Sequence, residues 1–425
     1  MLSGDNGILQ KATEAKTQTG VGQEKETIAL AYNSALAKKV SNGNSSAVTD
    51  SELNDELDNS EATASGNPII VTFTKSGNAY EIDSNGVIKP STPKDPNDKI
   101  TVAEAKTAGT IFNDNTILID GYENEVVVPK GFKIANDSAN NITGGIVIED
   151  ATYTNTIGSQ FVWIPVGNVK GKVIGSNEVT TTNIILGRYA FEDSSRNKSS
   201  EPIAWADLAN KGGYLQYGLM TMYNEELSST LSQKISHSGG FYIGRYEARC
   251  ATERNITVSN DKTLSDSNLS PLLEKSDGYI YSYITKSQAE MLSQNMYTAE
   301  TNSFESYLIS SYAWDTTMLF LQYFGESEYS IKGSMNTSSD GLAIQGTNNL
   351  DSSKQDNVCN VYDLASNYHE FTTEGTNSSS NPCTIRGGYV YNSDAYAGRR
   401  SQVSEDFAWS GNLTTFRPIL YVYTN

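Results

Sequence analysis

The sequence is poor in the residues that metal centres and catalytic sites use most often. Its 425 residues include two histidines and three cysteines, Cys250, Cys359 and Cys383, and no pair of cysteines has the Cys-x-x-Cys spacing. This scarcity argues against zinc binding, because structural zinc sites take four Cys or His ligands at short spacings. Cys359 and Cys383 allow a disulfide in an oxidising location, and buried free thiols are the alternative.

Basic charge and long apolar runs are also scarce. Lys and Arg number 31 against 50 Asp and Glu, which gives a formal net charge of −19. A field of this sign repels nucleic acid and anionic lipid, so neither is an expected partner. The apolar runs, such as 68–71 and 418–422, are far shorter than the roughly 20 residues of a membrane-spanning helix. Because Met1 opens directly into a polar helix, we expect that the chain was cut just after a removed membrane segment.

The first 90 residues carry a helical pattern and then a strand pattern. A helix is expected over 7–40, where four apolar residues recur at the spacing of one helical face: Ile28, Tyr32, Ala35 and Leu36. The sequence TDSE (49–52) is typical of a second helix start. After Gly66 the apolar residues follow period two, which predicts a small antiparallel meander over 69–88.

The chain divides in composition near residue 90. The stretch KPSTPKDPND (89–98) holds three of the ten prolines, and residues 91–100 are the expected linker. Residues 101–425 combine many short strand patterns with few helices and glycine-rich loops. The expected fold class is therefore α+β, with a helix and a small antiparallel sheet in 1–90 and a larger α+β domain in 101–425.

The opening, LSGDNGILQKATEAK continuing to QEKETIALAYNSALAKK, resembles the segment after the hydrophobic stem in pilin-like proteins of Gram-positive gut bacteria. The resemblance covers about 1–90. It implies an extracellular location, on the cell surface or in a pilus, with other pilin subunits as partners and membrane attachment only through the removed segment. A solvated charged helix without a special role is the alternative.

A second resemblance, to the formylglycine-generating-enzyme (sulfatase-modifying-factor) family, rests on motifs that follow the family's order. They are FVWIPV (161–166), GGFYIGRYEA (239–248), the matches to two helices at 284–297 and 306–321, NVYDLASNYHEFTTE (360–374), IRGGY (385–389) and FRPILYV (416–422). Together they span about 110–425. The resemblance implies a C-type-lectin-like fold for this region.

Charged and bulky residues inside these motifs have structural interpretations. Trp314 and Leu319 or Leu321 are expected to face the core from one helix. Arg386 and Arg417 stand inside apolar strands, so each needs a buried carboxylate partner such as Asp363 or Glu370.

An enzymatic role is not expected. The family's oxidases bind copper with cysteines just beyond the Arg-Gly-Gly stretch, whereas this chain reads GYVYN (388–392) there and has no later cysteine. Cys383 lies before Arg386, on the wrong side. His369 stands beside Glu370, but no Ser or Cys nucleophile is placed with them.

The family resemblance implies one cofactor, a structural calcium ion near Asn367 and Glu370. Oxygen ligands of this kind suit calcium. The residue before Asn367 is Ser366, where the family usually has glycine, which alters the loop. A hydrogen-bonded polar pair in the core is the alternative, and no other cofactor is expected.

The segment 389–412 is the expected ligand-binding surface, since Tyr, Trp, Ser and Asn are favoured in recognition loops. It resembles the variable stretch of lectin-fold proteins that are diversified by retroelements. The expected contact residues are Tyr389, Tyr391, Asn392, Ser393, Asp394, Tyr396, Arg400, Ser404, Asp406, Phe407, Trp409 and Asn412. We therefore expect a pilin-anchored, adhesin-like protein that binds a protein or glycan. A structural minor pilin subunit and a degenerate enzyme are the alternatives, and an ordinary polar loop is the alternative for the segment.

Overall fold

In the computed structural model the chain forms two compact units, residues 1–98 and 99–425. The boundary falls inside the stretch 91–100 that was expected to be a linker. The structure describes residues 4–44, 46–58, 61–83, 86–91, 99–192, 197–204, 207, 229–251, 272–274, 279–297, 304–333, 356–376, 378–388, 395–404 and 414–423. Within these ranges, no helix combines the length and the apolarity needed to cross a membrane.

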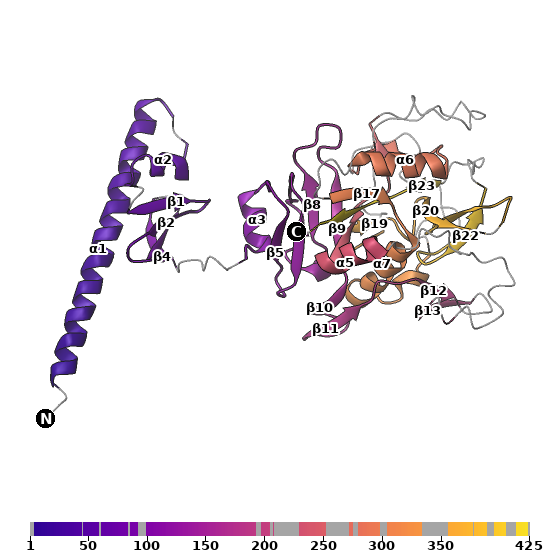
Figure 1. The fold of residues 1–425 in the computed structure, drawn as a ribbon, viewed down its shortest axis with the longest axis horizontal. Helices are drawn as coiled ribbons and strands as arrows, with labels where there is room; N and C mark the ends of the chain where they lie inside the picture. The colour runs from indigo at the N-terminus through magenta and orange to yellow at the C-terminus, as the bar shows by residue number, and fades with distance from the viewer. Residues whose placement is uncertain are drawn as a thin grey trace. The chain divides into compact units, whose positions relative to one another are not determined.

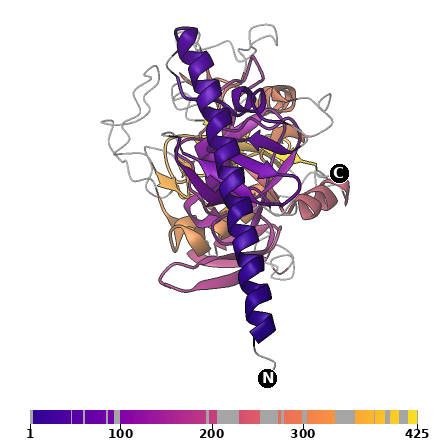
Figure 2. The ribbon, with the colours of Figure 1, turned by 90° about the vertical axis from the view of Figure 1, so that its left-hand side faces the viewer.

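Two helices and one sheet build the first unit. Helix α1 (Gly4–Ser41) is continuous, as Figures 1 and 2 show from two sides. Helix α2 (Asp50–Asn54) starts at a capping box, in which the Thr49 hydroxyl accepts from the Glu52 amide and the Glu52 carboxylate accepts from the Thr49 amide. This reciprocal pair satisfies two amides that the first helical turn leaves without partners. The predicted helix start is confirmed.

The sheet of the first unit is antiparallel, in the order β1 (Ala62–Ser65), β2 (Ile69–Phe73), β3 (Ala79–Ile82) and β4 (Ile88–Ser91). The predicted meander corresponds to β2 to β4, and β1 was not predicted. Alternate side chains of β2 are buried against Ile28 and Ala35 of α1, in one hydrophobic core. Leu36 was expected on this face, but its side chain is exposed.

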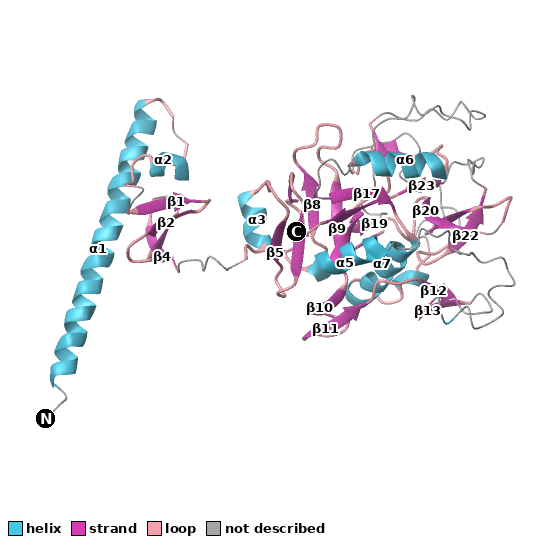
Figure 3. Ribbon diagram, in the orientation of Figure 1, coloured by secondary structure: helices cyan, strands magenta, loops and turns pink. Residues whose placement is uncertain are grey.

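The larger unit is a mixture of short strands and helices (Figure 3). Its helices are α3 (Val102–Ala108), α5 (Ser229–Ser238), α6 (Lys286–Met296) and α7 (Ser311–Phe324), with short 3-10 turns η1 (Ile142–Gly144) and η5 (Tyr329–Ile331). Within the described ranges, several sheets have two strands. They pair β5 (Thr116–Ile119) with β6 (Glu125–Val128), β10 (Gly167–Lys172) with β11 (Val179–Ile184), β12 (Tyr189–Glu192) with β13 (Lys198–Ala204), β15 (Arg249–Cys250) with β16 (Tyr279–Ile280), and β18 (Asn357–Val358) with β19 (Val361–Tyr362). The α+β class predicted from the sequence is confirmed.

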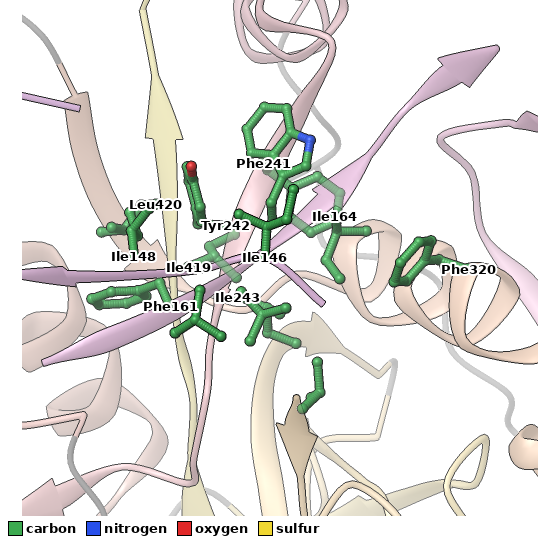
Figure 4. Packing of buried hydrophobic residues seen from close by; sticks show 14 of the residues in the cluster. Ile146, Ile148, Phe161, Ile164, Phe241, Tyr242, Ile243, Phe320, Ile419 and Leu420 are labelled. Carbon is green, nitrogen blue, oxygen red and sulfur yellow. The ribbon is translucent and has the colours of Figure 1, made fainter. Parts of the chain in front are cut away.

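A six-stranded antiparallel sheet carries the main core. Its order is β17 (Phe304–Leu308), β24 (Pro418–Val422), β14 (Gly240–Gly244), β9 (Gln160–Pro165), β8 (Val147–Asp150) and β7 (Phe132–Ile134). Figure 4 shows Phe161, Ile243 and Ile419 from three neighbouring strands close together. Trp314, Leu319 and Leu321 of α7 are buried as predicted.

A four-stranded sheet frames the predicted recognition segment. Its order is β22 (Arg400–Val403), β21 (Cys383–Arg386), β20 (His369–Gly375) and β23 (Thr414–Phe416), and the β20–β23 pair is parallel. The motifs at 360–374, 385–389 and 416–422 supply strands of the two sheets. The expectation of a helix over 306–321 was wrong in its first part, because 304–308 is β17, paired with β24.

Candidate functional site

The predicted recognition segment begins just after two positions, 387 and 388, that only glycine can occupy. Gly387 has φ +81, and a Cβ on Gly388 would lie 1.9 Å from the carbonyl oxygen of Ala365. The same Cβ would lie 3.2 Å from the carbonyl oxygen of Ala395. Gly388, just after β21, therefore lies directly beside Ala395. Residues 389–394 connect these two adjacent points of the scaffold.

Three of the twelve expected contact residues lie in the described part of the chain: Tyr396, Arg400 and Ser404. Ser404 is half-buried at the end of β22. The other nine lie outside the described residues: Tyr389, Tyr391, Asn392, Ser393, Asp394, Asp406, Phe407, Trp409 and Asn412. The structure thus places the middle of the segment and both strands that flank it.

Tyr396 is buried, and the expectation that it would be exposed was wrong. Only 3% of the Tyr396 surface is exposed to solvent. Its hydroxyl donates to the carboxylate of Glu192, and the Lys198 ammonium lies 4.8 Å from the centre of its ring. Both neighbours belong to the β12–β13 hairpin, about 200 residues earlier in the chain. The hairpin covers a side chain that local composition alone would place at the surface.

Arg400 is also buried, with a side chain that is 6% exposed. Its Nε donates to both oxygens of Glu374, at 2.9 and 3.0 Å, and its two terminal nitrogens donate to Asp315 and to the carbonyl oxygen of Tyr189. All four acceptors belong to the same unit of the protein. Arg400 was expected to contact a ligand, but in the structure its guanidinium forms its hydrogen bonds with residues of the same unit.

Arg400 is one member of a buried ionic network that we call the arginine network: Arg188, Asp315, Glu374, Arg386 and Arg400. Arg386 reaches Asp315 at 2.5 Å, and Arg188 pairs with Glu374. Burial tends to raise the pKa of Glu374, but Arg400, Arg188 and Arg386 outweigh it and hold that pKa below its usual value. Burial and the neighbouring Arg400 lower the pKa of Arg386 to about 10, so it stays charged at neutral pH.

The far end of the segment is fixed by a second buried pair. The Arg417 guanidinium meets the Glu370 carboxylate through contacts of 2.6, 3.0 and 3.1 Å, and it also donates to the carbonyl oxygens of Gly244 and Tyr362. The expected pairing of Arg417 with Glu370 is confirmed. Arg386 is paired as expected, although its partners are Asp315 and Glu374.

Glu370, one of the two residues expected to bind calcium, is already paired with an arginine. Both oxygens of Glu370 accept hydrogen bonds from Arg417, so a cation already satisfies this carboxylate. The Asn367 amide instead donates to Glu247, whose other oxygen accepts from the Tyr368 amide at 2.8 Å. Among the described residues, no three His, Cys, Asp or Glu side chains are grouped to hold a metal ion.

Burial changes the pKa values of one histidine and one cysteine of the larger unit. Burial lowers the pKa of His369 to about 3, and its Nδ1 lies 3.0 Å from the carbonyl oxygen of Gly387. This imidazole therefore stays neutral at neutral pH, and its role is to contact the backbone of Gly387. All three cysteines are free thiols, and burial raises the pKa of Cys359 to about 12. A thiol with that pKa is a poor nucleophile and a poor metal ligand at neutral pH.

Two other buried carboxyl groups, those of Glu247 and Asp363, have raised pKa values, whereas the pKa of Glu374 is lowered. Burial raises the pKa of Glu247, and the nearby Asp363 and Glu370 raise it further. Burial and the adjacent Asp356 raise the pKa of Asp363 to about 6. The cations Arg249 and Arg417 oppose both shifts without cancelling them. These two carboxyl groups therefore hold their protons more tightly than carboxyl groups in water do.

Comparisons with known proteins give distant likenesses only. No protein-family model matches the chain. No curated protein sequence matches it. Among solved structures, Treponema denticola variable protein 1 is similar with 13% identity and a TM-score of 0.30, over 63% of this chain and 98% of that one. A structure titled CarF is similar with 11% identity and a TM-score of 0.27, over 62% of this chain and 98% of that one.

Proposed function

We propose that the chain is an extracellular binding protein of a bacterial surface, which recognises a protein or glycan through residues near 389–412. The observation that carries the proposal is the frame of this segment. Arg386 and Phe416, in the strands on either side of it, are fully buried. The intervening residues 389–394 and 405–413 are rich in Tyr, Asn, Ser, Asp, Phe and Trp, the composition of recognition loops. A fixed frame around such residues allows them to change without changing the fold.

The first test asks whether the aromatic residues of the segment bind a partner. The full chain is screened against a glycan array and a panel of host and bacterial surface proteins, and the hits are measured with Tyr391→Ala and Trp409→Ala. We expect each variant to lose about 2 kcal/mol of binding free energy, roughly 30-fold in Kd. The melting temperature should change little, because residues that do not pack in the core contribute little to folding.

Tyr396→Ala is the matched control within the same segment. Because Tyr396 is buried, this change should lower the melting temperature, as loss of a buried aromatic side chain costs about 3–5 kcal/mol. If Tyr391→Ala and Trp409→Ala leave every detected affinity unchanged, the segment is not the binding surface. Sequences of relatives that differ mainly within 389–412 would support diversification of this surface.

A structural role in a pilus is the second candidate, and it is motivated by exposed apolar side chains on α1. Leu30 is 66% exposed and Val40 is 61% exposed, while Leu36, four residues before Val40, is also exposed. Packing of α1 against another molecule would remove these side chains from water, which is favourable. Sedimentation of the full chain tests this: concentration-dependent assembly that Leu30→Lys and Val40→Lys abolish would favour the pilus role.

We also propose that the protein is not an oxidase of the formylglycine-generating type. Cys383 precedes Arg386 along β21, and the sequence holds no cysteine after it. Cys250 and Cys383 are buried, and the Cys359 thiol has a raised pKa. Oxygen consumption with a cysteine-containing peptide substrate tests this directly, and turnover that is lost with Cys383→Ser would contradict it.

A further inference from the structure

The hairpin of β10 and β11 projects from the body of the larger unit (Figure 1). Its strands pair without a bulge, from Gly167 with Ile184 to Lys172 with Val179. Val169 and Ile184 belong to the main hydrophobic core, whereas most residues of β11 are exposed. Each strand of such a ribbon also has an outer edge, where backbone groups point away from the other strand.

The outer edge of β10 is covered by one side chain. The Lys170 amide donates to Oδ1 of Asn124 at 2.8 Å, and Nδ2 of Asn124 donates to the carbonyl oxygen of Lys170 at 2.8 Å. Because these backbone groups point away from β11, Lys170 and the opposite residue Thr181 exchange no hydrogen bonds with each other. Bonded and non-bonded pairs alternate along an antiparallel ladder. The backbone groups of Val179, Thr181 and Asn183 therefore point to the outer edge of β11.

This outer edge of β11 is open to solvent. Val179, Thr181 and Asn183 are exposed, and in the part of the chain that the structure describes no further strand pairs with β11. Proteins usually protect such an edge from pairing with another chain by a charge, a proline or a bulge. The sequence VTTTNIILG (179–187) contains neither a charged residue nor a proline, and the register of β11 is unbroken. The edge is therefore competent to accept another strand.

We propose that the outer edge of β11 pairs with β11 of a second copy of this chain, antiparallel about a two-fold axis at Thr181. In this register Thr181 faces the same residue of the other copy, and Val179 faces Asn183. Each of these pairs exchanges two hydrogen bonds, because their backbone groups point outward. Glu178, the charged residue just before β11, faces Ile184 of the other copy, so no like charges stand opposite each other.

Charge and symmetry favour a second copy as the occupant. The chain has a net charge of −19, so two copies repel each other over most of their surfaces, and an uncharged strand avoids like-charge contacts. Val179 and Ile185 are 49% and 58% exposed. The pairing places them diagonally across the interface, where their removal from water is favourable. Because Asn124 covers the outer edge of β10, the interface closes at two copies and does not extend through the hairpin.

Sedimentation velocity of the full chain over a concentration series tests the proposal. Thr181→Lys and Thr181→Glu each place two like charges opposite each other at the two-fold axis. Asn168→Lys is the matched control, because Asn168 is exposed on the same face of the hairpin but belongs to β10. Both positions are exposed, so the melting temperatures of all variants should stay close to that of the unchanged chain.

The unchanged chain should form dimers, and Thr181→Lys should weaken them about tenfold or more at low salt. Added salt should reduce this loss, because it screens the repulsion. Thr181→Glu should lose less, since Lys170 stands opposite position 181 within each copy. An equimolar mixture of Thr181→Lys and Thr181→Glu should recover the dimer, because opposite charges then meet at the axis. Asn168→Lys should leave the dimer unchanged.

A chain that stays monomeric at the highest concentration reached overturns the proposal, and a strand of another protein would then be the remaining occupant. Equal losses from Thr181→Lys and Asn168→Lys place the dimer elsewhere and also refute it. So does a mixture that fails to recover the dimer. Assembly through α1 is distinguished by Leu30→Lys, which should leave a dimer formed by β11 intact.

Discussion

Replacing Arg417 with methionine should lower the unfolding free energy of the larger unit far more than breaking an ion pair at the surface does. The Arg417 guanidinium and the Glu370 carboxylate are 0% and 1% exposed. Methionine leaves Glu370 without its cation and leaves the carbonyl oxygens of Gly244 and Tyr362 without their donor. Removing one partner of a buried pair costs about 3–5 kcal/mol, a large share of the 5–15 kcal/mol that stabilises a typical domain.

The loss should depend on pH in a direction that the structure fixes. Burial raises the pKa of Glu370, and Arg417 is the group that opposes this rise. Without Arg417 the pKa rises further, so the folded variant holds the proton more tightly than the unfolded chain. The variant should therefore recover part of its lost stability as the pH falls from about 8 to about 5, because a protonated carboxyl group needs no counter-charge.

Tryptophan fluorescence during urea unfolding is the assay. All four tryptophans, Trp163, Trp205, Trp314 and Trp409, lie in residues 99–425, so the signal reports on the larger unit alone. A double-mutant cycle with Glu370→Gln should show the two losses to be strongly non-additive, by about 2 kcal/mol or more. The control is Lys170→Met, which breaks the exposed pair with Glu123 in the same unit, where the two side chains are 47% and 79% exposed. It should cost far less than Arg417→Met, because solvent screens an exposed pair.

The reasoning fails if Arg417→Met costs no more than Lys170→Met. It also fails if the losses from Arg417→Met and Glu370→Gln simply add. Additivity would mean that each residue contributes through its own packing, and the contacts between the guanidinium and the carboxylate would then be incidental to stability.

Three further predictions concern other parts of the chain. Burial and Asp356 raise the pKa of Asp363 to about 6. The protonated Asp363 therefore stabilises the fold fully below about pH 4, and this stabilisation, on the order of 3 kcal/mol, is lost as the pH rises through 6. Asp363→Asn should remove that pH-dependent loss, and an unchanged pH profile of the unfolding free energy would contradict the prediction. Limited proteolysis should cut within 91–100 and release a stable fragment that starts near Lys99, and full protection of that stretch would count against two independent units. Replacing all three cysteines with serine should leave binding intact, and stoichiometric copper held by Cys250 or Cys383 in the unchanged chain would overturn the non-oxidase proposal.

Local signals predicted several elements of the smaller unit correctly. The capping box of Thr49 and Glu52 and the alternation of Ile69, Val71 and Phe73 are properties of a few neighbouring residues, and the structure confirms both. The start of the segment 306–321 shows where such reasoning ends. Residues 304–308 pair with β24, more than 100 residues away, and the alternating burial of FESYL is the period-two signal that could have identified a strand.

The candidate site was predicted less completely, because its partners come from distant parts of the chain. Arg386 and Arg417 were recognised as buried charges, but Asp315, Glu374 and Arg188 were missed as members of the arginine network. A signal for Asp315 existed, since it is the one charged residue in the largely apolar stretch YAWDTTMLF, where a charge requires a buried partner. Tyr396 offered no comparable signal, because the Glu192 carboxylate that its hydroxyl contacts lies about 200 residues earlier in the chain.

The two ionic sites stand at the two ends of one segment, and this arrangement bears on how the protein could vary. Arg386 and Arg400 fix the chain on either side of 389–394, while Arg417 fixes β24 directly after 405–413 and β23. Breaking a buried ion pair is costly because the remaining charge has no partner, so each of these points resists displacement. Under the proposed function, residues 389–394 and 405–413 would be selected for contact with a partner while the flanking strands keep their place.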